Sequence, residues 1–314
     1  MPKLVNLGSL CIDLVYDVPQ LAGAGETIAS VGRQVFCGGK GLNQSLAAAR
    51  AGAQVHHFGA VGDDGQDLLQ ALDKAGVKTS GIAQMVGPSG HAVIQVDQQG
   101  QNSIVIAGGT NRQLPMELID RAVAAVADGD WLLLQNETND VDTAIRGAAA
   151  TSGRVALNLA PPDMRIGDYP IGDLDLLIVN EAEANALAGT SSSGAALRTL
   201  MEQYPEVSLL LTMGGEGLYL YDSIDGVAQA MGAFAVTPVD ETAAGDSFVG
   251  YLMASLVAGE NLPDAVLRAS AAGAVAVTRA GAAPSIPSID EVGSLIEQQT
   301  PSFELREIDP GDLA

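Results

Sequence analysis

The stretch "WLLLQNETNDVDTAIRGAAATSGRVALNL", residues 131–159, decides the fold class of this chain. It begins with an almost wholly apolar run, continues with a helical pattern over 140–151, and ends with a second apolar run that follows Arg154. Strands that are apolar throughout are typical of parallel sheets buried on both faces, and a helix between two such strands returns the chain to a parallel neighbour. The stretch therefore predicts a β-α-β unit of an α/β fold.

The same alternation of short apolar runs and helical patterns continues on both sides of this stretch. It predicts a central, mostly parallel sheet with helices on both faces. The expected strands are 3–8, 53–62, 131–135, 154–159, 174–180 and 207–212, and the expected helices are 41–52, 66–76, 115–128, 140–151, 181–188 and 192–204. His56 and His57 fall inside an expected strand, where packing is the commoner role.

Two further strand-like regions, about 14–36 and 91–106, do not fit this rhythm. The second predicts a hairpin of two apolar strands around "DQQGQN". Because ligands of parallel α/β sheets gather at the carboxyl ends of the strands, a small separate sheet would form a β lid over that edge. We expect one domain over 1–300 that includes this lid, and a loose acidic tail over 301–314, which has few apolar residues.

Composition excludes several classes of protein. The chain has 314 residues, 47% of them hydrophobic, and a formal net charge of −23. Such acidity disfavours nucleic acid and anionic membranes as partners. It is explained either by solubility through self-repulsion or by adaptation to a salty cytoplasm, and unchanged folding and activity from low to high potassium chloride would rule out the second reading.

The expected compartment is the cytoplasm. Only two cysteines occur, Cys11 and Cys37, so no disulfide framework is implied. The N-terminal segment lacks the pattern of a signal peptide, and no apolar run is long enough to span a bilayer.

Two glycine-rich segments carry the chemistry. In "CGGKGLNQSLAAARAG", residues 37–52, Lys40 and Asn43 lie at the N-terminus of an alanine-rich helix, where their side chains can bind a polar ligand. In "PVDETAAGDSFVGYLMASLVAG", residues 238–259, small residues lead into an apolar helix. Their backbone N–H groups would point, unpaired, at the positive end of the helix dipole, which predicts an anion site.

Asp246 lies in the first turn of that second helix and has two interpretations. Acids at helix starts usually only cap the helix, but a carboxylate beside a phosphate site can also act as a general base. A polar-ligand site together with a phosphate cradle favours phosphoryl transfer to a hydroxyl. The patterns of P-loop NTPases, dinucleotide folds, H-E-x-x-H metalloproteases and G-x-S-x-G hydrolases are absent from the sequence.

Both segments resemble motifs of the ribokinase family of carbohydrate kinases. "GGKGLNQSLAAARAGA" and "VDETAAGDSF" occur in the order and spacing of that family, and the resemblance runs from "LVNLGSLCID" to "TRAGAAPSIP", nearly the whole chain before the tail. It implies an α/β sheet with a β lid that commonly also makes a dimer. It further implies ATP- and Mg²⁺-dependent phosphorylation of a sugar's primary hydroxyl, with ribose and its O5 as the first choice.

The resemblance assigns residues to roles one position at a time. Asp246 matches the catalytic base, and the anion hole is matched by Ala243, Ala244 and Gly245. The sugar-side positions are Cys11, Asp13, Gly39, Lys40, Asn43 and Glu137. The ATP-side positions are Asn180, Glu183, Thr212, Gly214, Gly217 and Ser270, the first two of which would order phosphates and Mg²⁺. An activating K⁺ would be held, mostly by backbone carbonyls, at Asp240, Thr242, Ala276, Arg279, Gly281 and Ser285.

Two departures from the family pattern leave the acceptor open. Cys11 stands where the family carries an asparagine, and a lost buried hydrogen bond costs about 1–3 kcal/mol, enough to change sugar preference. Glu241 stands where the family usually has a small residue or proline. Another furanose, fructose or a nucleoside thus stays possible as acceptor. Rivals of other classes are a non-catalytic sugar-binding or regulatory protein on the same scaffold and a nucleotide-binding protein without a sugar role.

Overall fold

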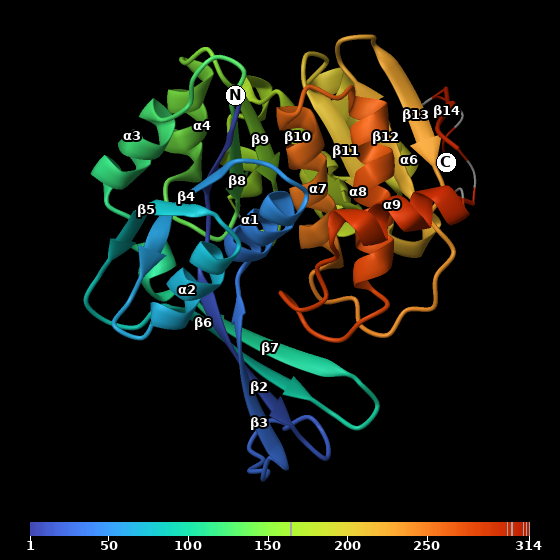
Figure 1. Ribbon diagram of the computed structural model, residues 1–314. Coiled ribbons are helices and arrows are strands. Elements are labelled where there is room, and N and C mark those ends of the chain that lie inside the picture. Colours follow the sequence, from blue (N-terminus) through green and yellow to red (C-terminus); the bar gives the residue numbers. More distant parts are fainter. Residues whose placement is uncertain (164, 300, 303, 310, 312, 314) are drawn as a thin grey trace.

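The computed structural model describes residues 1–163, 165–299, 301–302, 304–309, 311 and 313. Within these residues ten strands join into one sheet, in the order β14-β13-β12-β11-β10-β9-β8-β1-β4-β5 (Figure 1). Neighbours from β11 to β5 are parallel, and β11 to β14 pair antiparallel. The strands are β1 (Leu4–Leu7), β4 (Val55–Val61), β5 (Lys78–Gln84), β8 (Trp131–Gln135), β9 (Arg154–Asn158), β10 (Leu176–Asn180), β11 (Ser208–Thr212), β12 (Leu218–Asp222), β13 (Val227–Met231) and β14 (Arg306–Glu307).

Helices cover both faces of this sheet, as the apolar strands required. Successive residues of β8 point to opposite sides, so Leu133 joins one apolar core and Leu132 the other. The first core is covered by α1 (Lys40–Arg50), α2 (Gln66–Lys74), α7 (Ala244–Val257), α8 (Leu262–Ala276) and α9 (Ile289–Gln298). The second is covered by α3 (Met116–Ala124), α4 (Val141–Ala149), α5 (Glu181–Ala188) and α6 (Ser193–Gln203). The expected α/β fold is confirmed.

A second, separate sheet projects from the body (Figure 1), as the unplaced strands predicted. Its order is β3-β2-β6-β7, with β2 (Cys11–Asp17), β3 (Gly32–Gly38), β6 (Gly90–Val96) and β7 (Asn102–Ala107). One boundary of the prediction was wrong, because residues 19–31 are outside any strand and β3 begins at Gly32. That segment contains Pro19, Gly23 and Gly25, which favour turns over regular pairing.

Part of the expected loose tail is built into the large sheet. Arg306–Glu307 pair with β13, Pro301 is buried, and Ser302 N–H donates to Ala233 O at 2.9 Å. The prediction rested on low apolar content, but Leu305 and Ile308, two of the few apolar residues present, pack against the two cores, and the strand pairing uses the backbone, which every sequence supplies. The tail residues 303, 310, 312 and 314 lie outside the described residues.

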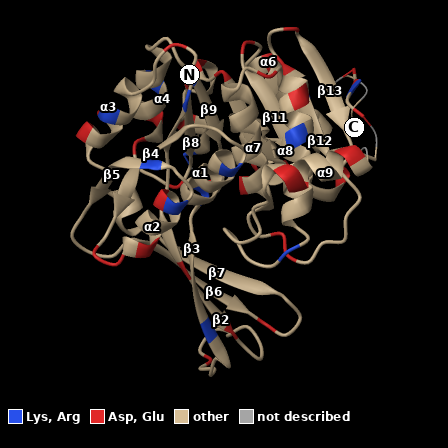
Figure 2. Ribbon diagram, viewed as in Figure 1, with Lys and Arg blue, Asp and Glu red and all other residues tan. Residues whose placement is uncertain are grey.

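Acidic residues are spread along the ribbon over the helices, the loops and the lid (Figure 2). None of the described helices combines the length and the apolar character needed to cross a bilayer.

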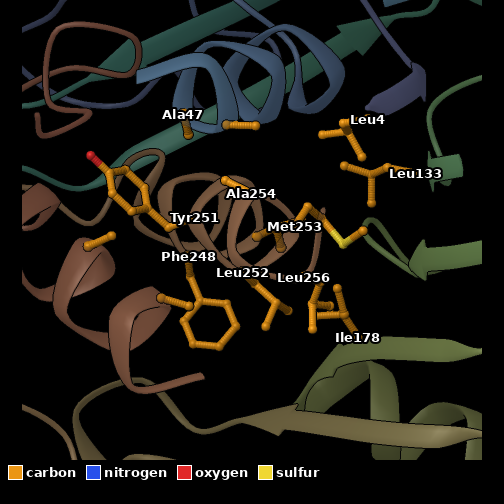
Figure 3. Packing of buried hydrophobic residues seen from close by; sticks show 14 of the residues in the cluster. Leu4, Ala47, Leu133, Ile178, Phe248, Tyr251, Leu252, Met253, Ala254 and Leu256 are labelled. Atoms are coloured by element: carbon orange, nitrogen blue, oxygen red, sulfur yellow. The ribbon is translucent and has the colours of Figure 1, made fainter. Parts of the chain in front are cut away.

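Helix α7 is the most deeply buried helix of the first core. Every residue from Ser247 to Val257 is buried, and Tyr251, Leu252 and Met253 are wholly so. Figure 3 shows these side chains directed to different neighbours, with Ala254 near Ala47 of α1 and Leu256 near Ile178 of β10. A helix that is apolar all round is typical of such a central position.

The crossing of α1 and α7 is close because Gly250 has no side chain. A Cβ at Gly250 would overlap the Ala47 methyl and lie 2.7 Å from Gln44 O and 2.8 Å from Ala48 N. Backbone atoms of α1 cannot give way as a flexible side chain would. The two helices therefore meet at a distance that only glycine at this position permits.

We expect Gly250→Ala to destabilise the protein by about 1–3 kcal/mol through overpacking. Gly293→Ala is the matched control, because Gly293 is also helical but a Cβ there meets nothing within 4 Å. It should raise stability by about 0.5–1 kcal/mol. Urea unfolding of both variants measures the difference, and equal effects of the two substitutions would contradict the close crossing.

Candidate active site

The turn into α1 is shaped by contacts with β2. Gly39, the residue before α1, has φ +92°, a conformation that favours glycine. A Cβ on Gly38 would overlap the Asp13 carboxylate, and one on Gly41 would overlap the backbone at Ser9. The glycines therefore let the chain pass directly against Asp13 and against the backbone at Ser9.

Glu137 reaches the start of α1 from the loop after β8. Its Oε2 accepts hydrogen bonds from Lys40 N–H at 3.0 Å and from the Ser9 hydroxyl. No side chain of α1 itself caps this helix, so Glu137 satisfies one of its free N–H groups and complements the positive end of its dipole. The loop is fixed in turn by Arg112, which donates to Thr138 O and Asn136 O at 2.8 and 3.2 Å.

Asp246 lies where α1 and α7 meet. Its Oδ2 accepts a hydrogen bond from Asn43 Nδ2 at 2.9 Å, and its Oδ1 accepts one from Gln44 Nε2 at 2.9 Å. The α1–α7 crossing thus brings together the two glycine-rich motifs, which lie about two hundred residues apart in the sequence. Asp246 and Asn43 were predicted from the sequence, whereas Gln44 was missed, although it adjoins Asn43 in the same motif.

The anion site at the start of α7 differs in one detail from the prediction. Ala243 precedes the helix with φ +59°, and no side chain caps this end. Of the three N–H groups expected to be unpaired, that of Ala244 donates to Glu241 O at 3.2 Å, because the chain turns there. The N–H groups of Ala243 and Gly245 have no hydrogen-bond partner among the described residues, and nothing lies within 4 Å of a Cβ built on Gly245.

Lys40 sits among carboxylates. Burial alone would lower its pKa, but the nearby Asp246, Glu137 and Glu183 outweigh burial and raise the pKa of Lys40. Burial, followed by the charges of Glu137 and Asp246, raises the pKa of Asp13 to about 7. The raised pKa keeps the Lys40 ammonium group protonated, and several carboxyl groups lie near it.

Cys11 is the buried first residue of β2, two residues before Asp13 and on the same face of the strand. Burial and then the charges of Glu137 and Asp13 raise the pKa of Cys11, so its thiol stays protonated. Asn111 Nδ2 lies 3.3 Å from Cys11 Sγ and also donates to Leu10 O at 3.0 Å. Asn111, on the loop before α3, was missed because nothing in its sequence neighbourhood connects it with β2.

The expected ATP-side residues follow β10 and β11. Asn180 and Glu183 form a capping box at the start of α5, in which Asn180 Oδ1 accepts from Glu183 N–H and Glu183 Oε2 accepts from Asn180 N–H, each at 2.9 Å. Glu183 is only 2% exposed, and burial raises its pKa. Thr212 ends β11, and Gly214 and Gly217 adopt positive φ in the turn before β12, as a hairpin turn there requires.

Two of the expected positions lie on α8 and at its end. Ser270 is a half-buried residue of α8, the helix that packs beside α7. Ala276 is the last residue of α8, and its carbonyl accepts from Arg279 N–H at 3.2 Å. The Arg279 side chain forms a salt bridge with Glu291 of α9.

The residues expected to bind a monovalent cation lie on two segments joined by Asp240. Asp240 Oδ1 accepts from the Thr242 hydroxyl and N–H at 2.6 and 2.9 Å, and Oδ2 accepts from Gly281 N–H at 2.8 Å. Burial alone would raise the pKa of Asp240, but these hydrogen bonds hold it below its ordinary value. Ser285 Oγ lies 3.4 Å from Thr242 O. Asp240 thus connects the segment at Thr242 with the segment at Gly281.

Asp13 should make stability fall as pH rises. Below about pH 4 the carboxyl is protonated in both states, but between about pH 4 and 7 only the unfolded state ionises, so folding becomes less favourable. Asp13→Asn removes this penalty. The melting temperature of this variant minus that of the wild type should therefore increase from pH 4 to 7 and then level off.

Asp17→Asn, at the other end of β2, removes a carboxylate outside this cluster and serves as the control. Thermal unfolding at a series of pH values measures all three proteins. A constant difference between Asp13→Asn and the wild type across this range would contradict the account of the cluster.

Comparison with known proteins identifies a family that suits this site. The family model described as "pfkB family carbohydrate kinase" matches residues 1–289. The ribokinase of Haemophilus influenzae is 33% identical over 303 residues, which cover 94% of this chain and 98% of that protein. The deoxyribokinase of Salmonella typhi is 31% identical over 295 residues, covering 91% and 95%.

A solved structure extends the comparison to three dimensions. The structure of Arabidopsis thaliana ribokinase complexed with ribose and ATP superposes with a TM-score of 0.83 at 28% identity, covering 94% of this chain and 99% of that one. Sequence and structure thus match over almost the whole chain, and the protein belongs to the pfkB family of carbohydrate kinases.

Proposed function

We propose that this protein transfers the γ-phosphoryl group of ATP to the primary hydroxyl of a sugar, and that ribose is the acceptor that gives ribose 5-phosphate. The observation that carries the proposal is the placement of Asp246. Its carboxylate lies in the first turn of α7, beside the free N–H of Gly245, and is held by Asn43 and Gln44 from the sugar-side helix. The similarity to ribokinases over most of the chain supports the same activity.

In this reaction Asp246 accepts the proton of the sugar hydroxyl as its oxygen forms a bond to the γ-phosphorus. The bond between that phosphorus and the β–γ bridging oxygen breaks, and ADP leaves. The unpaired N–H groups of Ala243 and Gly245, at the positive end of α7, stabilise the charge on the transferring group. Lys40 can donate to sugar or phosphate oxygens, and Asp13 and the free Oε1 of Glu137 can accept from sugar hydroxyls.

Glu183 fits a magnesium ion that binds together with the nucleotide. Glu183 is almost wholly buried, yet it has no salt-bridge partner among the described residues. The described residues also contain no group of three or more acidic, histidine or cysteine side chains that could hold a metal by itself. Mg²⁺ commonly takes one or two carboxylates together with phosphate oxygens, and when bound it neutralises phosphate charge. Asn180, fixed by the capping box, lies beside it.

Cys11 supports a second candidate within the same class, a kinase for a sugar that lacks one hydroxyl. The thiol is a weak hydrogen-bond partner, and its neighbour Asn111 already uses its amide on Leu10 and on the sulfur. A sugar hydroxyl placed against Cys11 would therefore gain little. Deoxyribose, fructose and nucleosides belong beside ribose in any acceptor test.

The lid favours a homodimer. Ile104 and Ile106 of the edge strand β7 are 51% and 58% exposed, and their cross-strand partners Ile94 and Ala92 lie on the face of the sheet that carries Asp13. An exposed apolar edge strand is a site for association. Light scattering should give twice the chain mass at micromolar concentration. The free cysteines and the use of ATP support a cytoplasmic protein.

The direct test measures ADP release with ATP, Mg²⁺ and K⁺ over ribose, deoxyribose, fructose, ribulose, adenosine, inosine and pseudouridine. We expect activity with ribose and a loss of about 10²–10⁴-fold in kcat for Asp246→Asn, since the base is removed. Asp264→Asn is the matched control, because Asp264 occupies the first turn of the neighbouring α8 and hydrogen-bonds with Asn261, the cap of that helix.

The outcomes of this test separate the candidates. If the enzyme prefers an acceptor other than ribose, the mechanism still holds, and Cys11 is the residue that explains the changed specificity. Release of no ADP with any acceptor, from a folded protein that binds ATP, would favour the sugar-binding or regulatory role. Equal losses in the two variants would mean that Asp246 has only a structural role.

We also propose that K⁺ activates the enzyme by fixing the 240–246 loop. Carbonyl oxygens at Thr242, Ala276 and Gly281 suit a hard cation, and Asp240 braces both segments. Activity should be several-fold higher in potassium than in tetramethylammonium chloride at the same ionic strength. Equal rates in the two salts would contradict a cation at this place.

A further inference from the structure

Gln44 is the buried side chain that connects the proposed base with the sheet. It is 0% exposed, and its Nε2 lies 2.9 Å from Asp246 Oδ1 and 3.0 Å from Asn158 Oδ1. An amide nitrogen has two hydrogens, so both are used. Asn158 ends β9, and its Nδ2 lies 3.4 Å from Ile178 O of β10, the strand that leads to Asn180 and Glu183.

The two amides fix the plane of the carboxylate. Asn43 binds Oδ2 and Gln44 binds Oδ1, so rotation of the Asp246 carboxylate breaks at least one hydrogen bond. Each carboxylate oxygen can accept more than one hydrogen bond, which leaves acceptor capacity for a substrate hydroxyl. Asn43 is 5% exposed and Gln44 is 0% exposed, and the Gln44 amide nitrogen lies between Asp246 and Asn158.

The other end of the Gln44 amide is unfavourable for stability. Its Oε1 is buried and has no hydrogen-bond partner among the described residues. A buried acceptor without a partner destabilises the folded state, and an apolar side chain of similar shape would avoid that penalty. An amide at this position is therefore better explained by its effect on Asp246 than by a contribution to folding.

We propose that Gln44 is a positioning residue, which aligns the Asp246 carboxylate with the acceptor hydroxyl and ties it through Asn158 to the β10 edge that leads to the ATP-side residues. The inference rests on the proposed phosphoryl transfer, with Asp246 as base. Gln44 itself touches neither substrate. Its contribution is to orientation, and a misplacement of reacting groups by about 1 Å can cost roughly 10²-fold in rate.

The test compares Gln44→Met with Gln135→Met. Gln135 is a matched control, because it is also 0% exposed and donates to Asn6 Oδ1 at 2.9 Å. Among the described residues its Oε1 has no partner and its side chain makes no hydrogen bond to Asp246. Gln44→Met should lower kcat by about 10–100-fold with little change in the KM for ATP. Its melting temperature should equal or exceed that of the wild type. Gln135→Met should change kcat by less than about threefold.

A double variant separates action through Asp246 from a general structural effect. If Gln44 acts by orienting this carboxylate, Gln44→Met should lower kcat no further when Asp246→Asn is already present. Gln44→Glu, which keeps the shape but sets a carboxylate against Asp246, should be slower than Gln44→Met because like charges repel.

Three results would overturn the inference: a kcat of Gln44→Met within about threefold of the wild type, equal losses in the Gln44 and Gln135 variants, or an undiminished loss in the Asp246→Asn background. Failure of the proposed function is distinguishable, because the wild type would then release no ADP with any acceptor. Failure of the positioning role alone leaves the wild type active.

Discussion

The close crossing of α1 and α7 at Gly250 is the constraint on which the rest of the site depends. It places Asn43 and Gln44 within hydrogen-bond distance of Asp246. The same contact points the start of α1, which carries Lys40, and the start of α7, with its free N–H groups, into one region. Because α7 is buried on all sides, the position of Asp246 is fixed by the packing of the whole first core and not by a loop.

Charge supplies the second constraint. Asp246, Glu137 and Glu183 lie near the ammonium group of Lys40, and Asp13 lies near Glu137 and Asp246. Glu137 uses one oxygen on the start of α1, and Glu183 uses one on the start of α5, so two of these acids also hold helices in place. Many acceptors suit a ligand that is rich in hydroxyl groups, whereas Lys40 and the start of α7 offer donors to phosphate groups. That division agrees with a sugar on one side and a nucleotide on the other.

The parts of this account that the sequence predicted are local. The β-α-β rhythm, the separate lid and the short motifs follow from periodicity and from residue types within a few positions. What the sequence missed depends on distant contacts: β5 is an edge strand with few apolar residues, β14 pairs through its backbone, and Ala244 N–H turns back to Glu241. Ser9, Gln44, Asn111 and Asn158 have ordinary neighbours in the sequence, and only the packing of α1, β2 and β9 brings them to the site.

The central claim is that one carboxylate, fixed between two helices, meets both substrates. A crystal structure of the protein with ribose and a non-hydrolysable ATP analogue tests it most directly. The account predicts the primary hydroxyl of ribose within hydrogen-bond distance of Asp246 and in line with the γ-phosphorus, whose oxygens face the N–H of Gly245. A sugar bound with that hydroxyl away from Asp246, or a γ-phosphate far from the start of α7, would contradict it.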